Sequence, residues 1–206
     1  MTSADAAALA RMLTIGRLVM APIVAGLLFF AAAVPDMAAA ARFWALALFA
    51  LAAATDAADG YIARRFGAVS ALGAGLDHAA DKALTAAALV ALAATVWPME
   101  LAIAAMALIV RDVAIAGLRE GLAGSGADLP VDRWGKLKTI LLMLGIGAAI
   151  LEAALISFPR SGIADAAWFV AMIGVWGALG LSLWSAGRYF LQAMRVGARR
   201  DQPRGH

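Results

Sequence analysis

The chain has 206 residues, of which 64% are hydrophobic and 15% are charged, and its mean hydropathy is +0.86. Soluble domains usually contain about 25% charged residues, so this composition excludes an ordinary soluble protein and predicts an integral membrane protein. The net charge is only +3 and cysteine is absent, which excludes disulfides and thiolate metal sites. The length allows one membrane domain with short tails, and we expect no nucleic-acid partner.

The apolar segments predict an all-α fold of about six transmembrane helices, preceded by an N-terminal interfacial helix over 1–17. This first segment is too short to span, because Arg11 and Arg17 interrupt it. A spanning helix needs about 20 residues. Spans are expected near 18–34, 43–62, 72–96, 101–118, 137–158 and 168–190, with breaks at Pro35, Pro98 and Pro159. The membrane domain therefore covers 18–190, and a basic tail covers 191–206.

Basic residues are unevenly distributed among the expected loops. The loops on one side, around 35–42, 97–100 and 159–167, hold Arg42 and Arg160 out of 17 basic residues in the chain. Because Lys and Arg are enriched in cytoplasmic loops, we expect the other side and both termini to face the cytoplasm. The Arg-rich tail is interpreted as an anchor that is attracted to anionic lipid.

Four carboxylates lie within otherwise apolar sequence between residues 56 and 81: Asp56, Asp59, Asp77 and Asp81. An ionisable residue inside a membrane segment costs about 2.5 to 3.5 kcal/mol, so four of them in neighbouring helices indicate a site. Carboxylates that converge from two helices suit a hard divalent cation such as Mg²⁺ or Mn²⁺. The alternative is that the aspartates serve only as polar contacts between helices.

Small residues accompany these carboxylates at helical spacing. If both halves of the segment are helical, each carries one stripe: Asp56, Asp59, Gly60 and Ala63 in the first, and Gly73, Asp77 and Asp81 in the second. The second helix would then direct its carboxylates toward the first. The glycines leave space for a bulky ligand.

Two clusters of basic residues are expected on the same side of the membrane as the aspartates. Arg111 lies within an apolar segment, with Arg119 eight residues later, and Lys136 and Lys138 begin a later helix. One interpretation is that they are cations that extend to the membrane surface. The other is that they capture an anionic substrate, for which Arg offers a bidentate fork and Lys a point charge.

Residues 56–81 have the pattern D-x2-D-G-x2-A-R-x8-G-x3-D-x3-D, which resembles the signature of the CDP-alcohol phosphatidyltransferase family. Three further runs, which begin at Leu13, Arg111 and Gly135, are similar to those of bacterial members that use glycerol 3-phosphate as acceptor. The resemblance covers residues 13 to about 139. It departs at His78, where related enzymes usually carry proline, and an Asn expected just before Leu13 is missing.

The resemblance implies a metal-dependent transfer of the phosphatidyl group from CDP-diacylglycerol to glycerol 3-phosphate, with release of CMP. It implies four metal ligands, Asp56, Asp59, Asp77 and Asp81, of which Asp81 would also be the general base. It implies donor-binding residues at Asp59, Gly60, Ala63, Arg64 and Gly73. The acceptor phosphate would be held by Arg111, Arg119, Lys136 and Lys138.

The resemblance also implies a homodimer in the bacterial inner membrane, in contact with membrane lipid, with its active site open to the cytoplasm. The acceptor stays open at this stage, because inositol phosphate, serine or phosphatidylglycerol would use the same aspartates. A membrane prenyltransferase would carry two separated aspartate boxes, which the sequence lacks. An ion carrier would use the buried carboxylates with Lys82 and Arg111 as partners, but it would not explain the spacing of the glycines.

Overall fold

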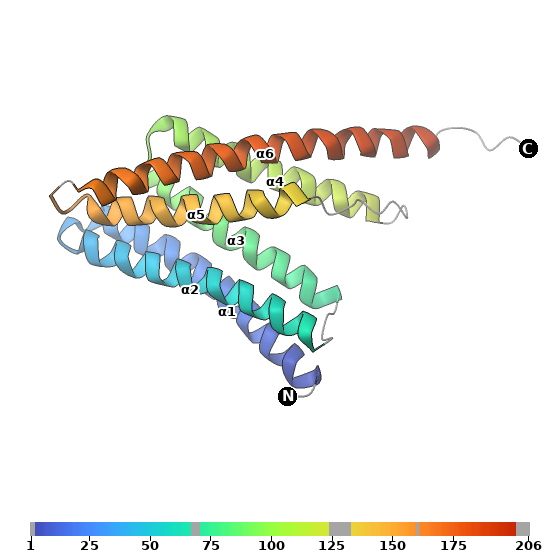
Figure 1. Ribbon diagram of the computed structural model, residues 1–206, viewed down its shortest axis with the longest axis horizontal. Helices are drawn as coiled ribbons and strands as arrows, with labels where there is room; N and C mark the ends of the chain where they lie inside the picture. The colour runs from blue at the N-terminus through green and yellow to red at the C-terminus, as the bar shows by residue number, and fades with distance from the viewer. Residues whose placement is uncertain (1–2, 67–70, 124–132, 160, 201–206) are drawn as a thin grey trace, which may run out of the picture.

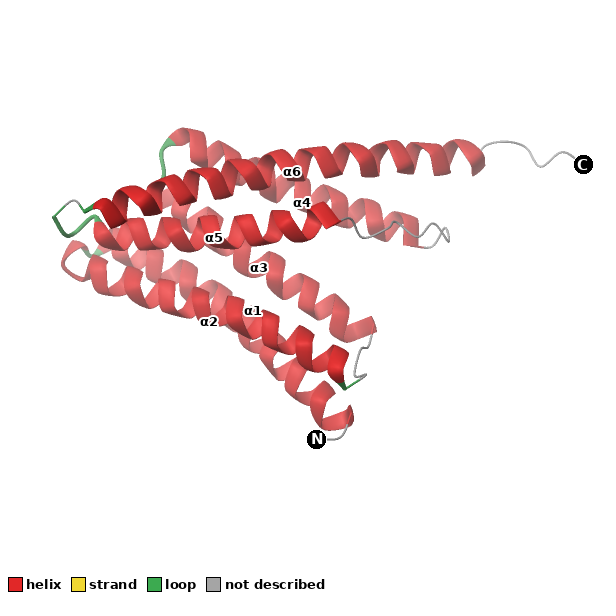
Figure 2. Ribbon diagram, in the orientation of Figure 1, coloured by secondary structure: helices red, strands yellow, loops and turns green. Residues whose placement is uncertain are grey.

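The computed structural model describes residues 3–66, 71–123, 133–159 and 161–200, and within these ranges the fold is entirely helical. Six long helices run lengthwise, and the N-terminus of α1 and the C-terminal end of α6 lie at the same end (Figure 1). Figure 2 shows that short connections join the helices at the other end. The elements are α1 (Ser3–Ala33), the 3-10 helix η1 (Pro35–Met37), α2 (Ala38–Arg65), α3 (Ala71–Thr95), α4 (Met99–Ala123), α5 (Arg133–Leu155) and α6 (Gly162–Arg200).

Prolines set the breaks at the end of the bundle opposite the termini. Val34 leaves the helical region, with φ −126° and ψ 85°, and Pro35 then begins η1. Pro98 separates α3 from α4, and its carbonyl accepts the N–H groups of Leu101 and Ala102 in the first turn of α4. A proline disfavours helical backbone at the residue before it, so α1 and α3 each end shortly before one. The predicted breaks at Pro35 and Pro98 are confirmed.

The predicted all-α membrane fold is confirmed, but fewer helices than the six expected meet the requirements of a membrane span. Five helices in the described part of the chain are long and apolar enough to cross a membrane, and they are α1, α2, α4, α5 and α6. Helix α3 is not among them because its N-terminal half carries Asp77, Asp81 and Lys82. The expected count of six spans is therefore not confirmed.

The predicted domain boundaries are not visible as breaks in the helices. Helix α1 continues through residue 17, so the expected interfacial segment 1–17 and the first span form one helix. Helix α6 likewise continues into the predicted tail as far as Arg200. How these ends lie relative to the membrane surface stays a prediction.

Helix α1 packs along both α2 and α3, while α2 and α3 touch each other over only a small area. Helix α5 packs closely along α6 and also against α2, and α4 lies against α3 and α6. The core between them contains one or more large buried side chains from every helix: Leu28, Phe49, Leu92, Leu108, Ile146 and Val175. Large apolar side chains are also exposed on the outside, including Trp44, Ile103 and Phe169, as expected of a surface that faces lipid.

Two glycines allow α5 and α6 to approach closely. A Cβ atom added to Gly174 would lie 2.6 Å from the Cα of Gly145, and one added to Gly145 would lie 3.0 Å from the Cα of Gly174. Without a hydrophobic driving force between helices in lipid, such close backbone packing is a main source of helix association. This crossing fixes the separation of two helices that carry site residues.

Candidate active site

A cavity of about 600 Å³ lies between α2, α3, α4, α5 and α6, nearer the end of the bundle where the termini lie. Six of the residues predicted to form the site line this one cavity: Asp56, Asp77, Asp81, Arg111, Lys136 and Lys138. The predicted metal ligands and the predicted acceptor-binding cations thus share one space. The distance in sequence between them is large, so only the helix packing brings them together.

On the acidic side of the cavity, Arg17 of α1 joins the two halves of the aspartate segment. Its guanidinium donates to Oδ1 of Asp56 on α2, and to Oδ1 of Asp77 on α3 at 2.7 Å. Arg17 is only 1% exposed. The carboxylates of α2 and α3 therefore converge on one positive charge from α1, rather than facing each other directly as the spacing alone predicted.

Asp81 lies one helical turn beyond Asp77 on α3, and it contacts the basic side of the cavity only weakly. Its Oδ2 is 3.9 Å from Nζ of Lys82, and its Oδ1 is buried and accepts no hydrogen bond in the described structure. A buried carboxylate oxygen without a donor is costly. Such an oxygen is available to a cation or to a substrate hydroxyl.

The carboxylate chemistry fits a divalent cation. Asp56 and Asp77 already converge on one positive charge, and Asp81 has a buried oxygen without a donor. Among the described side chains, no group of three Asp, Glu or His residues lies close enough to hold an ion. The side chain of Asp59, the fourth predicted ligand, is not described. The four-aspartate metal site therefore stays a prediction.

On the basic side of the cavity, Asp112 of α4 joins three cations from three helices. Its Oδ2 accepts from Nζ of Lys82 on α3 at 2.7 Å. Its Oδ1 accepts from Nζ of Lys138 on α5 at 2.5 Å and from Nη1 of Arg111 at 3.0 Å. Charge-assisted bonds of this kind are about twice as strong as neutral ones. The cations of the cavity are thus ordered around one carboxylate.

Arg111 is also tied to α6. Its Nε donates to the backbone carbonyl of Ser182 at 3.0 Å, and its Nη2 donates to Oγ of Ser185 at 2.5 Å. The side chains of Arg111 and Lys138 are 12% and 5% exposed. Both side chains are thus enclosed largely by neighbouring helices, an arrangement that favours a role in the cavity over the snorkelling interpretation. Lys136 is exposed at the cavity rim, where both interpretations remain open.

Residues 7–186 of the chain match the CDP-alcohol phosphatidyltransferase family. The chain belongs to this family. The match covers α1 to most of α6 and includes every residue that lines the cavity up to Ser185. The family is in general dependent on divalent metal ions, in agreement with a cavity that presents carboxylate oxygens.

Curated members of the family that are similar to the chain have one name in common, CDP-diacylglycerol–glycerol-3-phosphate 3-phosphatidyltransferase. The protein of Bacillus subtilis is 38% identical over 130 residues, which are 61% of the chain and 64% of that protein. The protein of Haemophilus influenzae is 37% identical over 105 residues, which are 50% of the chain and 57% of that protein. The protein of Escherichia coli is 35% identical over 153 residues, which are 73% of the chain and 79% of that protein. The chain thus matches less than two thirds of the length of the first two relatives.

The predicted donor-binding residues lie at the C-terminal end of α2 and at the N-terminal end of α3, which follows it in the chain. Asp59, Gly60, Ala63 and Arg64 belong to the last two turns of α2, and Gly73 lies in the first turn of α3. The side chains of this α2 segment lie outside the described part, and so does the side chain of Arg119 on α4. Their roles in this family member stay predictions.

Four residues that contribute to the site were not predicted from the sequence to belong to it: Arg17, Lys82, Asp112 and Ser185. Arg17 and Asp112 fall in the runs that carry the family resemblance, but their partners lie on other helices. The sequence indicates Lys82 only as a carboxylate partner in an ion carrier, and in the structure its closest carboxylate is that of Asp112. Ser185 had no signal, since a serine in an apolar helix is common in membrane proteins.

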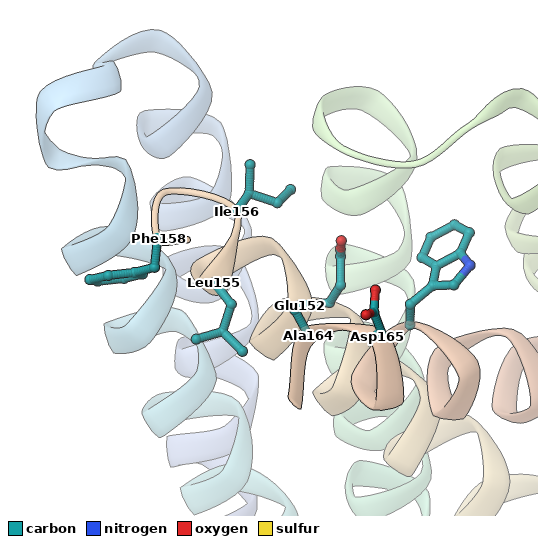
Figure 3. Close-up of a pocket in the computed structure, with 7 residues that line it drawn as sticks. Glu152, Leu155, Ile156, Phe158, Ala164 and Asp165 are labelled. Carbon is teal, nitrogen blue, oxygen red and sulfur yellow. The ribbon is translucent and has the colours of Figure 1, made fainter. Parts of the chain in front are cut away.

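A second cavity, of about 430 Å³, lies at the connection between α5 and α6, at the end of the bundle opposite the termini. Figure 3 shows the carboxylates of Glu152 and Asp165 near each other, with Leu155, Ile156 and Phe158 to one side of them. Among the described residues that line it, two are acidic and none is basic. None of the predicted site residues lies there.

Proposed function

We propose that the protein transfers the phosphatidyl group of CDP-diacylglycerol to glycerol 3-phosphate, giving phosphatidylglycerophosphate and CMP. The observation that carries this proposal is the single cavity in which three aspartates of the family signature lie opposite Arg111 and Lys138. The names of the similar bacterial proteins support the same donor and acceptor. The alternative is a different alcohol acceptor, and the experiment must distinguish it from glycerol 3-phosphate.

The aspartates would act on the donor. Asp56, Asp59, Asp77 and Asp81 would hold Mg²⁺ or Mn²⁺, which when bound neutralises diphosphate charge and stabilises the departing CMP. Asp59, Gly60, Ala63, Arg64 and Gly73 would line the nucleotide and diphosphate. Small residues at the glycine positions let a ligand come close to the backbone. These roles are inferred from the family signature. The structure does not describe the side chains concerned on α2.

The transfer would be a single displacement. Asp81 would accept the proton of the primary hydroxyl of glycerol 3-phosphate as the hydroxyl oxygen forms a bond to the phosphorus that carries diacylglycerol. The bond from that phosphorus to the CMP oxygen breaks, and CMP leaves with the electron pair. The buried, unpartnered Oδ1 of Asp81 supports this role, because no protein donor competes for it in the described structure.

The basic side of the cavity would hold the phosphate of the acceptor. Arg111 and Lys138 are buried, ordered and directed into the cavity, and Lys136 and Arg119 would add charge at its rim. The distribution of Lys and Arg supports a cytoplasmic location for the cavity and for both termini. We expect the protein to work as a homodimer in the inner membrane of a bacterium, in contact with membrane lipid.

Purified protein supplied with CDP-diacylglycerol and Mg²⁺ or Mn²⁺ tests the proposal. Glycerol 3-phosphate, inositol phosphate, serine and phosphatidylglycerol are offered separately, and the lipid products are identified by mass. We expect phosphatidylglycerophosphate from the first acceptor, and no product with a chelator present. Product from serine alone would contradict the acceptor, and no product from any alcohol would contradict the enzyme class.

A further inference from the structure

Asp112 is the only described carboxylate that contacts three cations of the cavity. It lies at the centre of the basic side, between α3, α4 and α5. We infer that Asp112 is a positioning residue for the acceptor phosphate, which orders Lys82, Arg111 and Lys138 into one cradle while Ser185 anchors Arg111 on α6. This inference rests on the proposed function, and it adds Lys82 to the residues that contact the acceptor.

The charge of this group suits a phosphate monoester. Three cations and one carboxylate leave a net charge of +2. A phosphate monoester carries about −1.5 to −2 charges at pH 7. The cluster therefore balances one such group, whereas an acceptor with no net charge, such as the serine zwitterion, would leave the net charge of +2 unbalanced.

The hydrogen-bond donors also suit it. An ammonium has three N–H donors and a guanidinium has five. Lys82 and Lys138 each use one donor on Asp112, and Arg111 uses three on Asp112, Ser182 and Ser185, so each cation keeps two donors in the described structure. All three cations line the cavity. The remaining donors can meet the oxygens of a phosphate without breaking the contacts to Asp112.

Asp112 has two opposing effects on the binding of the acceptor phosphate. As a charge, its carboxylate repels a phosphate, so its removal would tighten binding. As a positioning group, it holds together three like charges that would otherwise separate, so its removal would weaken binding. Three short contacts from three helices favour the second effect, because no other described group joins Lys82 to Lys138.

Asp112→Asn tests this difference, since Asn keeps the volume and loses the charge. We expect the KM for glycerol 3-phosphate to rise about tenfold, with kcat and the KM for CDP-diacylglycerol within about twofold, because one charge-assisted contact to phosphate is lost. Glu100→Gln is the matched control. It removes one negative charge from an exposed position in the first turn of the same helix and should change neither KM. A lower or unchanged KM for glycerol 3-phosphate in Asp112→Asn overturns the inference.

Two further variants separate positioning from a general structural defect. Ser185→Ala removes one of the two hydrogen bonds that tie Arg111 to α6 and should raise the same KM several-fold with kcat kept. An unchanged KM overturns the inference even if Asp112→Asn does not fold. In the double variant Asp112→Asn with Lys138→Gln, the KM for glycerol 3-phosphate should rise by less than the product of the two single increases. Both residues act on one phosphate contact, so their effects are not independent. Fully multiplicative effects would mean that Asp112 does not act through Lys138.

The outcomes also separate this inference from the proposed function. A wild-type protein that makes phosphatidylglycerophosphate while Asp112→Asn keeps its acceptor KM contradicts the inference alone. If the wild-type protein prefers another phosphorylated alcohol, the acceptor assignment fails and the same KM comparison is made with that alcohol. If it prefers an acceptor without a phosphate, both fail.

Discussion

The close crossing of α5 and α6 predicts a large difference between two chemically identical substitutions. Gly174→Ala adds a methyl group that would lie 2.6 Å from the Cα of Gly145 and 2.7 Å from the carbonyl oxygen of Leu141. Both neighbours are backbone atoms, which cannot rotate away. To reach ordinary contact at about 3.4 Å, the two helices must move apart. The same change at Gly180 on α6 meets nothing within 4 Å.

The size of the effect follows from these distances. Forcing an extra methyl group into a closely packed interface costs about 1 to 3 kcal/mol. In a chain of about 200 residues, each kcal/mol lowers the midpoint of thermal unfolding by roughly 2 to 4 °C. Gly180→Ala should be neutral or slightly stabilising, because alanine is favoured over glycine in a helix by about 0.5 to 1 kcal/mol.

Thermal unfolding of both variants in the same detergent, at one scan rate, measures the difference. We expect Gly174→Ala to unfold several degrees below the wild type and Gly180→Ala to unfold at or above it. Gly174→Ala should also lose activity, because α5 carries Lys138 and α6 carries Ser185. Equal midpoints for the two variants would refute the role of the glycine crossing.

Three other predictions concern the site. Asp56→Asn and Asp77→Asn should nearly abolish turnover and weaken metal binding while the protein still inserts into the membrane; normal activity at ordinary metal concentrations would remove that residue from the ligand set. Gly60→Leu should raise the KM for CDP-diacylglycerol by obstructing the nucleotide, and unchanged donor kinetics would mean that the nucleotide lies elsewhere. Arg111→Gln and Lys138→Gln should raise the KM for glycerol 3-phosphate roughly ten- to a hundredfold, from a loss of about 1.5 to 3 kcal/mol, with the donor KM within a few-fold. An equal loss toward both substrates would show that these cations hold the donor or the fold.

The sequence predicted the helices well because local signals determine them. Apolar segments of membrane-spanning length and the prolines at 35 and 98 define where helices begin and end. The sequence does not indicate that α1 is continuous, because Arg11 and Arg17 interrupt its apolar run. Arg17 is buried instead, because carboxylates of two other helices surround its guanidinium. A buried arginine of this kind cannot be recognised from its own helix.

The sequence singled out six residues that line one cavity, but it did not indicate the contacts between helices. Helical spacing placed Asp77 and Asp81 on one face of a helix, and both line the cavity. Spacing does not say which helix lies beside which, so it could not place α1 between α2 and α3. For the same reason it could not show that Asp112 joins residues 26 and 30 positions away. Those contacts depend on the packing of α3, α4 and α5.

The central claim is that one cavity joins a CDP-diacylglycerol donor to a phosphorylated acceptor, and a competition assay tests it most directly. The purified wild-type protein is given CDP-diacylglycerol, a divalent cation, and equal concentrations of glycerol 3-phosphate and serine in one reaction, and the lipid products are separated by mass. We predict that phosphatidylglycerophosphate predominates, and that Lys138→Gln reduces this product in the same mixture. Faster formation of phosphatidylserine by the wild-type protein would contradict the claim.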